Sequence, residues 1–92
     1  MTKEQIRTKF DRWAERVGHT PLENDLDNAT LLLSYDDKQT STTLSTVAVY
    51  AVAVHTDHVH VFLFSVRTAW QLDERGNTGE VLDKRYRVIV AF

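Results

Sequence analysis

The stretch LSTVAVYAVAVHTDHVHVFLFSVRTAW, residues 44–70, decides the fold of this 92-residue chain. It is the most apolar segment of the chain, and it is rich in the β-branched and aromatic residues that are typical of strands. Its polar centre, residues 55–58 (HTDH), separates two runs of the kind that pair as a hairpin. We therefore predict two long paired strands, over residues 43–55 and 58–71.

A helix is predicted ahead of this hairpin, over residues 3–17. Apolar residues recur there at spacings of four, three and four, which places them on one stripe of a helix: Ile6, Phe10, Trp13 and Val17. Thr2 and Gln5 form a capping box at the start, and Gly18 ends the helix because glycine adopts the left-handed conformation easily. The charges on its other side, which include Arg12, Glu15 and Arg16, are interpreted as a solvated face.

Two further strands complete the predicted fold, one over residues 30–35 and one over residues 80–92. They flank the long hairpin and are separated from it by polar or glycine-containing turns. The expected fold class is α+β, with one N-terminal helix packed on a four-stranded antiparallel meander in the order α-β-β-β-β. At this length residues 1–92 form a single domain with one modest core.

The two faces of the sheet are separated by the alternation of side chains along each strand. A two-residue turn at Thr56-Asp57 pairs His55 with His58 and Ala51 with Phe62. The helix then covers the side of Phe62, and the opposite face is apolar without a partner: Tyr50, Val52, Val54, Val59, Val61 and Leu63. One short helix cannot cover two faces, so either the sheet curls strongly around the helix or this face packs against another molecule.

The leading hypothesis is therefore a non-enzymatic interaction or assembly module that forms a homo-oligomer, or binds a protein partner, through that face. No cofactor is predicted. The chain contains no glycine-rich phosphate loop, no G-x-S-x-G elbow, no H-E-x-x-H motif and no cysteine nucleophile. A catalytic site needs several matched groups, and none is evident, so an enzyme is not expected.

Three histidines near the hairpin end provide an alternative hypothesis. His55, His58 and His60 could bind a metal, because neutral imidazole is a common ligand, or they could lie at the mouth of a small-molecule cavity between helix and sheet. The competing interpretation is that they are half-exposed residues where apolar sheet meets water. A second shell that would orient them as ligands is not evident in the sequence.

A basic cluster near the C-terminal end provides a weaker alternative, which is nucleic-acid binding through Arg67, Lys84, Arg85 and Arg87. The net charge of −2 argues against it, and such charges also protect an exposed edge strand. The N-terminus has no signal-peptide pattern, and the longest apolar run is far below the roughly 20 residues of a membrane span. We expect a cytoplasmic protein with no membrane partner.

Overall fold

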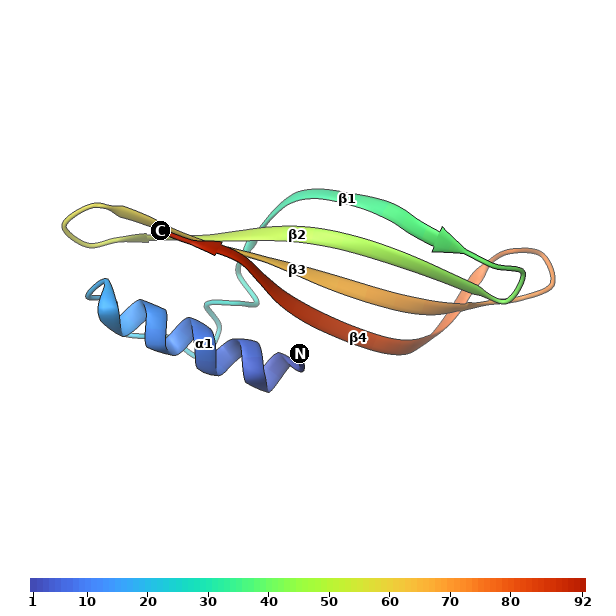
Figure 1. Ribbon diagram of the computed structural model, residues 1–92, viewed down its shortest axis with the longest axis horizontal. Helices are drawn as coiled ribbons and strands as arrows, with labels where there is room; N and C mark the ends of the chain where they lie inside the picture. The colour runs from blue at the N-terminus through green and yellow to red at the C-terminus, as the bar shows by residue number, and fades with distance from the viewer.

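The computed structural model describes residues 1–92 and contains one helix and four strands in a single antiparallel sheet. The elements are α1 (Lys3–Arg16), β1 (Thr30–Gln39), β2 (Thr43–His55), β3 (Val59–Leu72) and β4 (Thr78–Ala91). Neighbours in sequence are neighbours in the sheet, in the order β1-β2-β3-β4 (Figure 1). The predicted α+β class and the α-β-β-β-β order are confirmed.

The start and end of α1 follow from the local sequence. The Thr2 hydroxyl accepts a hydrogen bond from the Gln5 N–H, and the Gln5 side chain accepts one from the Thr2 N–H, so the predicted capping box is present. The last helical residue is Arg16, one short of the predicted end. Gly18 has a φ of 86°, the left-handed conformation that stops a helix with little strain in glycine.

Both edge strands differ from the prediction in length: β1 ends four residues later than predicted, and β4 begins two residues earlier and ends one residue earlier. β1 continues past the predicted residue 35 to Gln39, because Asp36 and Lys38 still pair with residues of β2.

At the other edge, the Met1 amino group donates to the Tyr86 carbonyl at 2.9 Å, and the Tyr86 N–H donates to the Met1 carbonyl at 2.8 Å. The outer edge of β4 is thus paired at Tyr86.

The register of the β2–β3 hairpin differs from the predicted register by one residue. Phe62 pairs with Val52, whereas the sequence predicted Ala51 as its partner. The strands are joined by three residues, 56–58, instead of the two that the prediction assumed. Because side chains alternate, this single extra turn residue moves every side chain of β2 to the other face relative to β3.

Hydrogen bonds within the turn explain why it holds three residues. The Asp57 carboxylate accepts from the His58 N–H at 2.9 Å, and the Thr56 N–H donates to the His58 carbonyl at 3.1 Å. Thr-Asp lacks the glycine or asparagine that a tight two-residue hairpin turn favours. The aspartate instead stabilises a wider turn through its own side chain.

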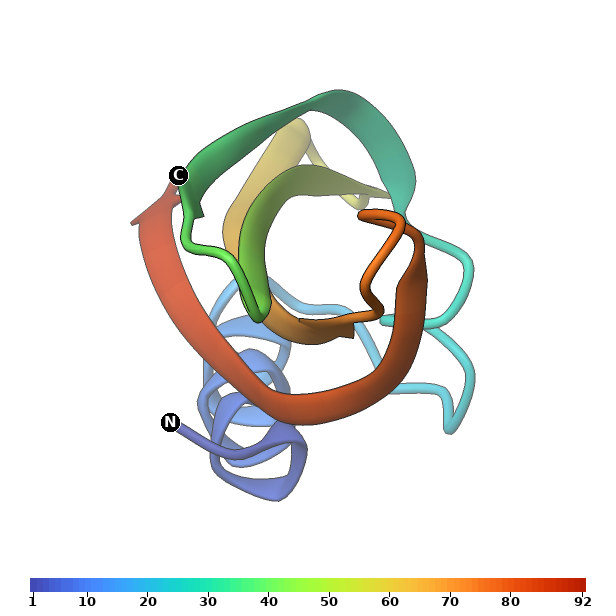
Figure 2. The ribbon, with the colours of Figure 1, turned by 90° about the vertical axis from the view of Figure 1, so that its right-hand side faces the viewer.

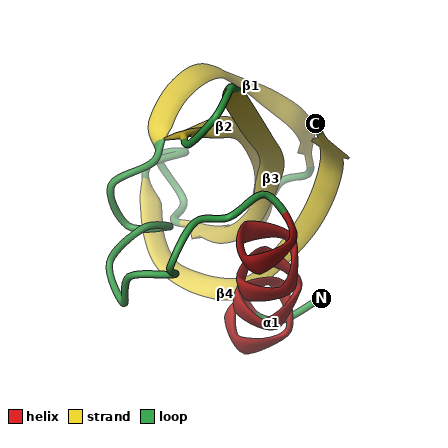
Figure 3. Cartoon of the chain, turned by 90° about the vertical axis from the view of Figure 1, so that its left-hand side faces the viewer, coloured by secondary structure: helices red, strands yellow, loops and turns green.

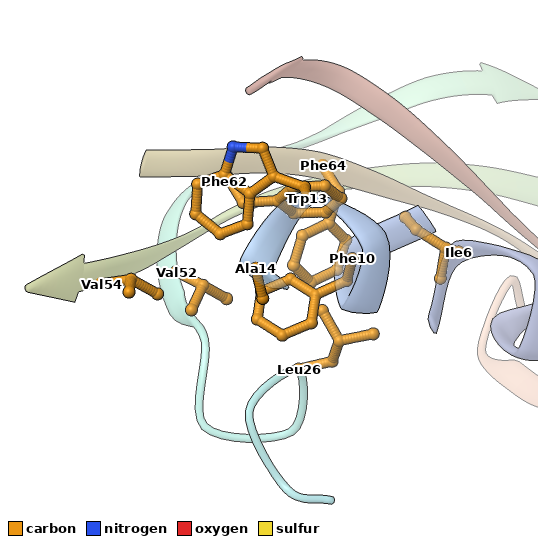
Figure 4. Close-up of a cluster of buried hydrophobic side chains, with 9 residues drawn as sticks. All are labelled: Ile6, Phe10, Trp13, Ala14, Leu26, Val52, Val54, Phe62 and Phe64. Carbon is orange, nitrogen blue, oxygen red and sulfur yellow. The ribbon is translucent and has the colours of Figure 1, made fainter. Parts of the chain in front are cut away.

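The core lies where α1 packs against the ends of β2 and β3. It consists of nine buried side chains (Figure 4): Ile6, Phe10, Trp13, Ala14, Leu26, Val52, Val54, Phe62 and Phe64. The Phe10 and Phe62 rings meet edge to face, with centroids 5.2 Å apart, which is a favourable aromatic geometry. Only 12 of the 92 residues are buried, so this cluster carries most of the apolar stabilisation.

The molecule is long and narrow, with extents of 52 × 21 × 17 Å. Its radius of gyration is 15.4 Å, whereas a compact domain of this length has about 12 Å. The sheet is strongly coiled, but α1 lies beside the coil and not within it (Figures 2 and 3). Because α1 lies against one end of the sheet only (Figure 1), the far half is a single layer.

Replacing Ile6 with valine tests whether stability is concentrated at the helix end. Ile6 is fully buried, and losing one methylene there should cost about 0.5–1.5 kcal/mol of unfolding free energy. The matched control is Ile89→Val, since Ile89 is 50% exposed on β4 and should change stability little. Urea unfolding of both variants measures the difference, and equal losses would contradict a core confined to this end.

Candidate functional site

The six residues predicted as an interface do not share one face, and that prediction is wrong in its composition. The observed register places Tyr50, Val52 and Val54 on the side of α1, where Val52 and Val54 are 8% and 3% exposed. Val59, Val61 and Leu63 lie on the opposite side. The extra turn residue, described above, causes this division.

We call the side without α1 the open face. Its apolar residues come from all four strands: Leu33, Tyr35, Val47, Val49, Ala51, Val59, Val61, Leu63 and Val90. Pairings across the sheet bring them together, since Leu33 lies opposite Val49, and Leu63 lies between Ala51 and Val90. The open face therefore carries a continuous apolar band.

Three residues of this band are exposed, and five of the others are half-buried. Leu33, Tyr35 and Val59 are 51%, 49% and 59% exposed, although each is large and apolar. Val47 is the buried exception, and it lines a groove of about 610 Å³ together with Tyr35 and Val49. The band is thus partly exposed and partly hollowed, a combination found at interaction sites.

The predicted basic cluster is divided between the two sides of the sheet. Arg85 lies opposite Arg67, and Arg87 opposite Ser65, all on the open face. Lys84 pairs with Thr68 on the side of α1.

Two of the arginines on the open face have acidic partners. Arg67 pairs with Asp37, and that hydrogen bond raises the pKa of the guanidinium above its ordinary value. Arg85 pairs with Asp83 at 2.9 Å. These carboxylates offset two of the three arginine charges that line the groove on the open face, and Arg87 alone is left for a phosphate backbone to contact.

The three histidines are likewise not brought together as a ligand set. His60 lies opposite Val54 on the side of α1, His55 lies on the open side, and the exposed His58 belongs to the turn. The His58 and His60 rings are 6.2 Å apart between centroids. No group of three or more His, Cys, Asp or Glu side chains in the chain is placed to hold a metal ion.

Asp57 organises this end of the hairpin. Its carboxylate lies 3.2 Å from His60 Nε2 and 2.9 Å from the Thr56 hydroxyl. Hydrogen bonds from His60, from Thr56 and from the His58 N–H lower the pKa of this carboxyl below its ordinary value. The Thr56 hydroxyl is also 2.9 Å from the Val17 carbonyl, and its single proton serves one of the two acceptors at a time.

The helix–sheet cavity of the small-molecule hypothesis is filled. Trp13 and Phe62 pack directly, with ring centroids 5.3 Å apart, and no histidine lines a cavity between them. A groove of about 680 Å³ does exist along one flank of α1, between Lys9, Arg12 and Arg16 of the helix and Phe62, Val88 and Ala91 of the sheet. We call it the basic groove.

Trp13, which lines this groove, carries an unusual polar atom. Its indole Nε1 is buried and has no hydrogen-bond acceptor. An unsatisfied buried donor of this kind costs about 1–3 kcal/mol. Sequence reasoning missed the basic groove, although the spacing of Lys9, Arg12 and Arg16, three and then four residues, indicates cations beside Trp13 on one helix flank.

Comparison with known proteins finds no matching family model, no matching curated protein and no matching solved structure. The single helix, α1, is neither long nor apolar enough to cross a membrane.

Replacing Asp57 with asparagine tests the role of its charge in the turn. A carboxyl whose pKa is lower in the folded state stabilises the protein above its unfolded pKa, and this stabilisation is lost as the pH falls through the folded pKa. Asp57→Asn should therefore lower Tm at neutral pH, and the difference should close below about pH 4.

Thermal unfolding across this pH range measures the effect. Glu80→Gln on β4 is the matched control, since Glu80 is exposed and has no side-chain hydrogen bond. A Tm difference for Asp57→Asn that stays constant from neutral to acidic pH would show that the charge is not responsible.

Proposed function

We propose that this chain is a non-enzymatic self-association module in which two copies pack their open faces together. The observation that carries the proposal is an apolar band from four strands that α1 does not cover and on which Leu33, Tyr35 and Val59 are exposed. A sheet face of this composition normally packs against a second layer. The driving force is burial of apolar area, and no chemistry is required.

The amount of exposed surface supports a partner of standard size. The chain exposes 6426 Å², whereas a compact monomer of this mass exposes about 5,500 Å². The excess, on the order of 900 Å², is close to the roughly 800 Å² per partner that a stable interface buries. The elongated shape is thus consistent with one half of a larger particle.

A second copy fits the open face better than a highly charged partner does. The band is apolar in its middle, and the nearby cations Arg67 and Arg85 already have carboxylate partners in the same chain. Arg87 is the one arginine of this face without such a partner, so each copy brings one unpaired arginine to the interface. A two-fold axis would set the same surface on both sides, which is the commonest arrangement in homo-oligomers.

The double variant Leu33→Asp/Val59→Asp tests the proposal. Both side chains are more than half exposed, so the folded protomer should tolerate the change, while the charges should weaken a dimer by at least about a hundredfold in Kd. Sedimentation equilibrium over a range of concentrations measures the dimer, and circular dichroism checks the fold. Val52→Asp would not be informative, because Val52 is part of the core.

Leu22→Asp is the control, since Leu22 is 54% exposed but lies in the connector after α1. We expect a dimer for the natural sequence and for Leu22→Asp, and a folded monomer for the double variant. A natural chain that remains monomeric at all concentrations would refute the proposal, and so would equal dissociation by the control.

A further inference from the structure

The basic groove combines cations with no acid paired to them. Lys9, Arg12 and Arg16 lie along one flank of α1, and none of them is within ion-pair distance of a carboxylate. On the other flank, Lys3 pairs with Asp27 at 2.9 Å and Arg7 with Asp11 at 3.0 Å. The charges beside the groove are therefore available to a ligand.

The remainder of the groove is apolar. Trp13, Phe62, Val88 and Ala91 line it, and they come from α1, β3 and the last residues of β4. Its volume of about 680 Å³ falls within the roughly 300–1,000 Å³ of sites that hold small organic molecules. Cations above an apolar surface match a ligand that is charged at one end and apolar at the other.

The unpartnered indole is a second and independent observation. Trp13 is only 3% exposed, and its Nε1 has no acceptor, whereas the Nε1 of Trp70 donates to the Thr46 hydroxyl at 3.0 Å. Figure 4 shows the Trp13 nitrogen on the edge of the ring turned away from Ala14 and Leu26. The nitrogen is closed to solvent, so a ligand oxygen can provide its missing acceptor only by displacing the side chains that cover it.

We propose that the basic groove binds an organic carboxylate with an apolar body. The carboxylate is held by Arg12 and Arg16, since guanidinium groups bind carboxylates with directed hydrogen bonds. It accepts from the Trp13 indole once it has displaced the side chains that close this nitrogen to solvent. The apolar body lies against Phe62 and Val88. Glu15, the one acid in the lining, favours a ligand with a single negative charge over a polyanion. This site lies on the side of α1 and does not depend on self-association through the open face.

The indole N–H resonance of Trp13 in a two-dimensional ¹H–¹⁵N spectrum provides a direct test. The protein has two tryptophans, so the Trp70→Phe variant assigns the signal. The uniformly labelled full chain is titrated with sodium octanoate and, separately, with octanamide, its uncharged counterpart. Octanoate should move the Trp13 indole signal downfield in a saturable manner, and octanamide should bind at least about tenfold more weakly.

A pair of charge-matched variants separates specific binding from general attraction. Arg12→Gln/Arg16→Gln should raise the octanoate Kd at least about tenfold, while Lys38→Gln/Arg75→Gln, which removes the same charge far from the groove, should leave it unchanged. Equal effects of the two variants, or equal binding of octanoate and octanamide, would overturn the proposal. A Trp13 signal that moves with an oligoglutamate peptide but not with octanoate would also overturn it, in favour of an acidic protein partner.

Discussion

The three-residue turn between β2 and β3 determines which side chains of this protein form its core. It pairs Val52 with Phe62, so the valines of β2 and the phenylalanines of β3 face α1 together. A turn one residue shorter would place alanines opposite the phenylalanines and expose the valines. Asp57 and Thr56 fix the turn through hydrogen bonds that also reach the end of α1, so helix and hairpin are positioned by the same few atoms.

The sequence predicted the elements well because their signals are local. The spacing of Ile6, Phe10 and Trp13, together with the Thr2–Gln5 capping box, was sufficient for α1, and the bounds of the long strands were within one residue of those predicted. The residues that share a sheet face were not predicted correctly. The alternation of side chains along one strand does not determine which residues of the partner strand lie on the same side until the length of the turn is known. An aspartate that closes a turn with its own side chain has no strong sequence signature.

The candidate sites were harder to predict for a related reason. The sequence predicted an apolar sheet face without a helix on it, because it holds more apolar residues than one helix can cover. The structure has a face that α1 does not cover, but the residues of β2 on it differ from those predicted, and β1 also contributes. The histidines look clustered in sequence, but the sheet divides them between its two sides. The three arginines do share the open face, and only Lys84 of the basic cluster lies on the other side. The basic groove depends on the end of β4 returning beside α1, a contact between residues far apart in the chain.

The unequal lengths of helix and sheet have a consequence for how the molecule unfolds. A 14-residue helix is about 21 Å long, whereas the 14 residues of β4 extend over about 46 Å. The free energy of local opening should then decrease along the long axis, away from α1. Amide hydrogens near the turns at residues 40–42 and 73–77 should exchange through local openings that leave the helix end intact. A molecule that docks on the far half would therefore order it as well as contact it, so that association and completion of the fold are thermodynamically one process.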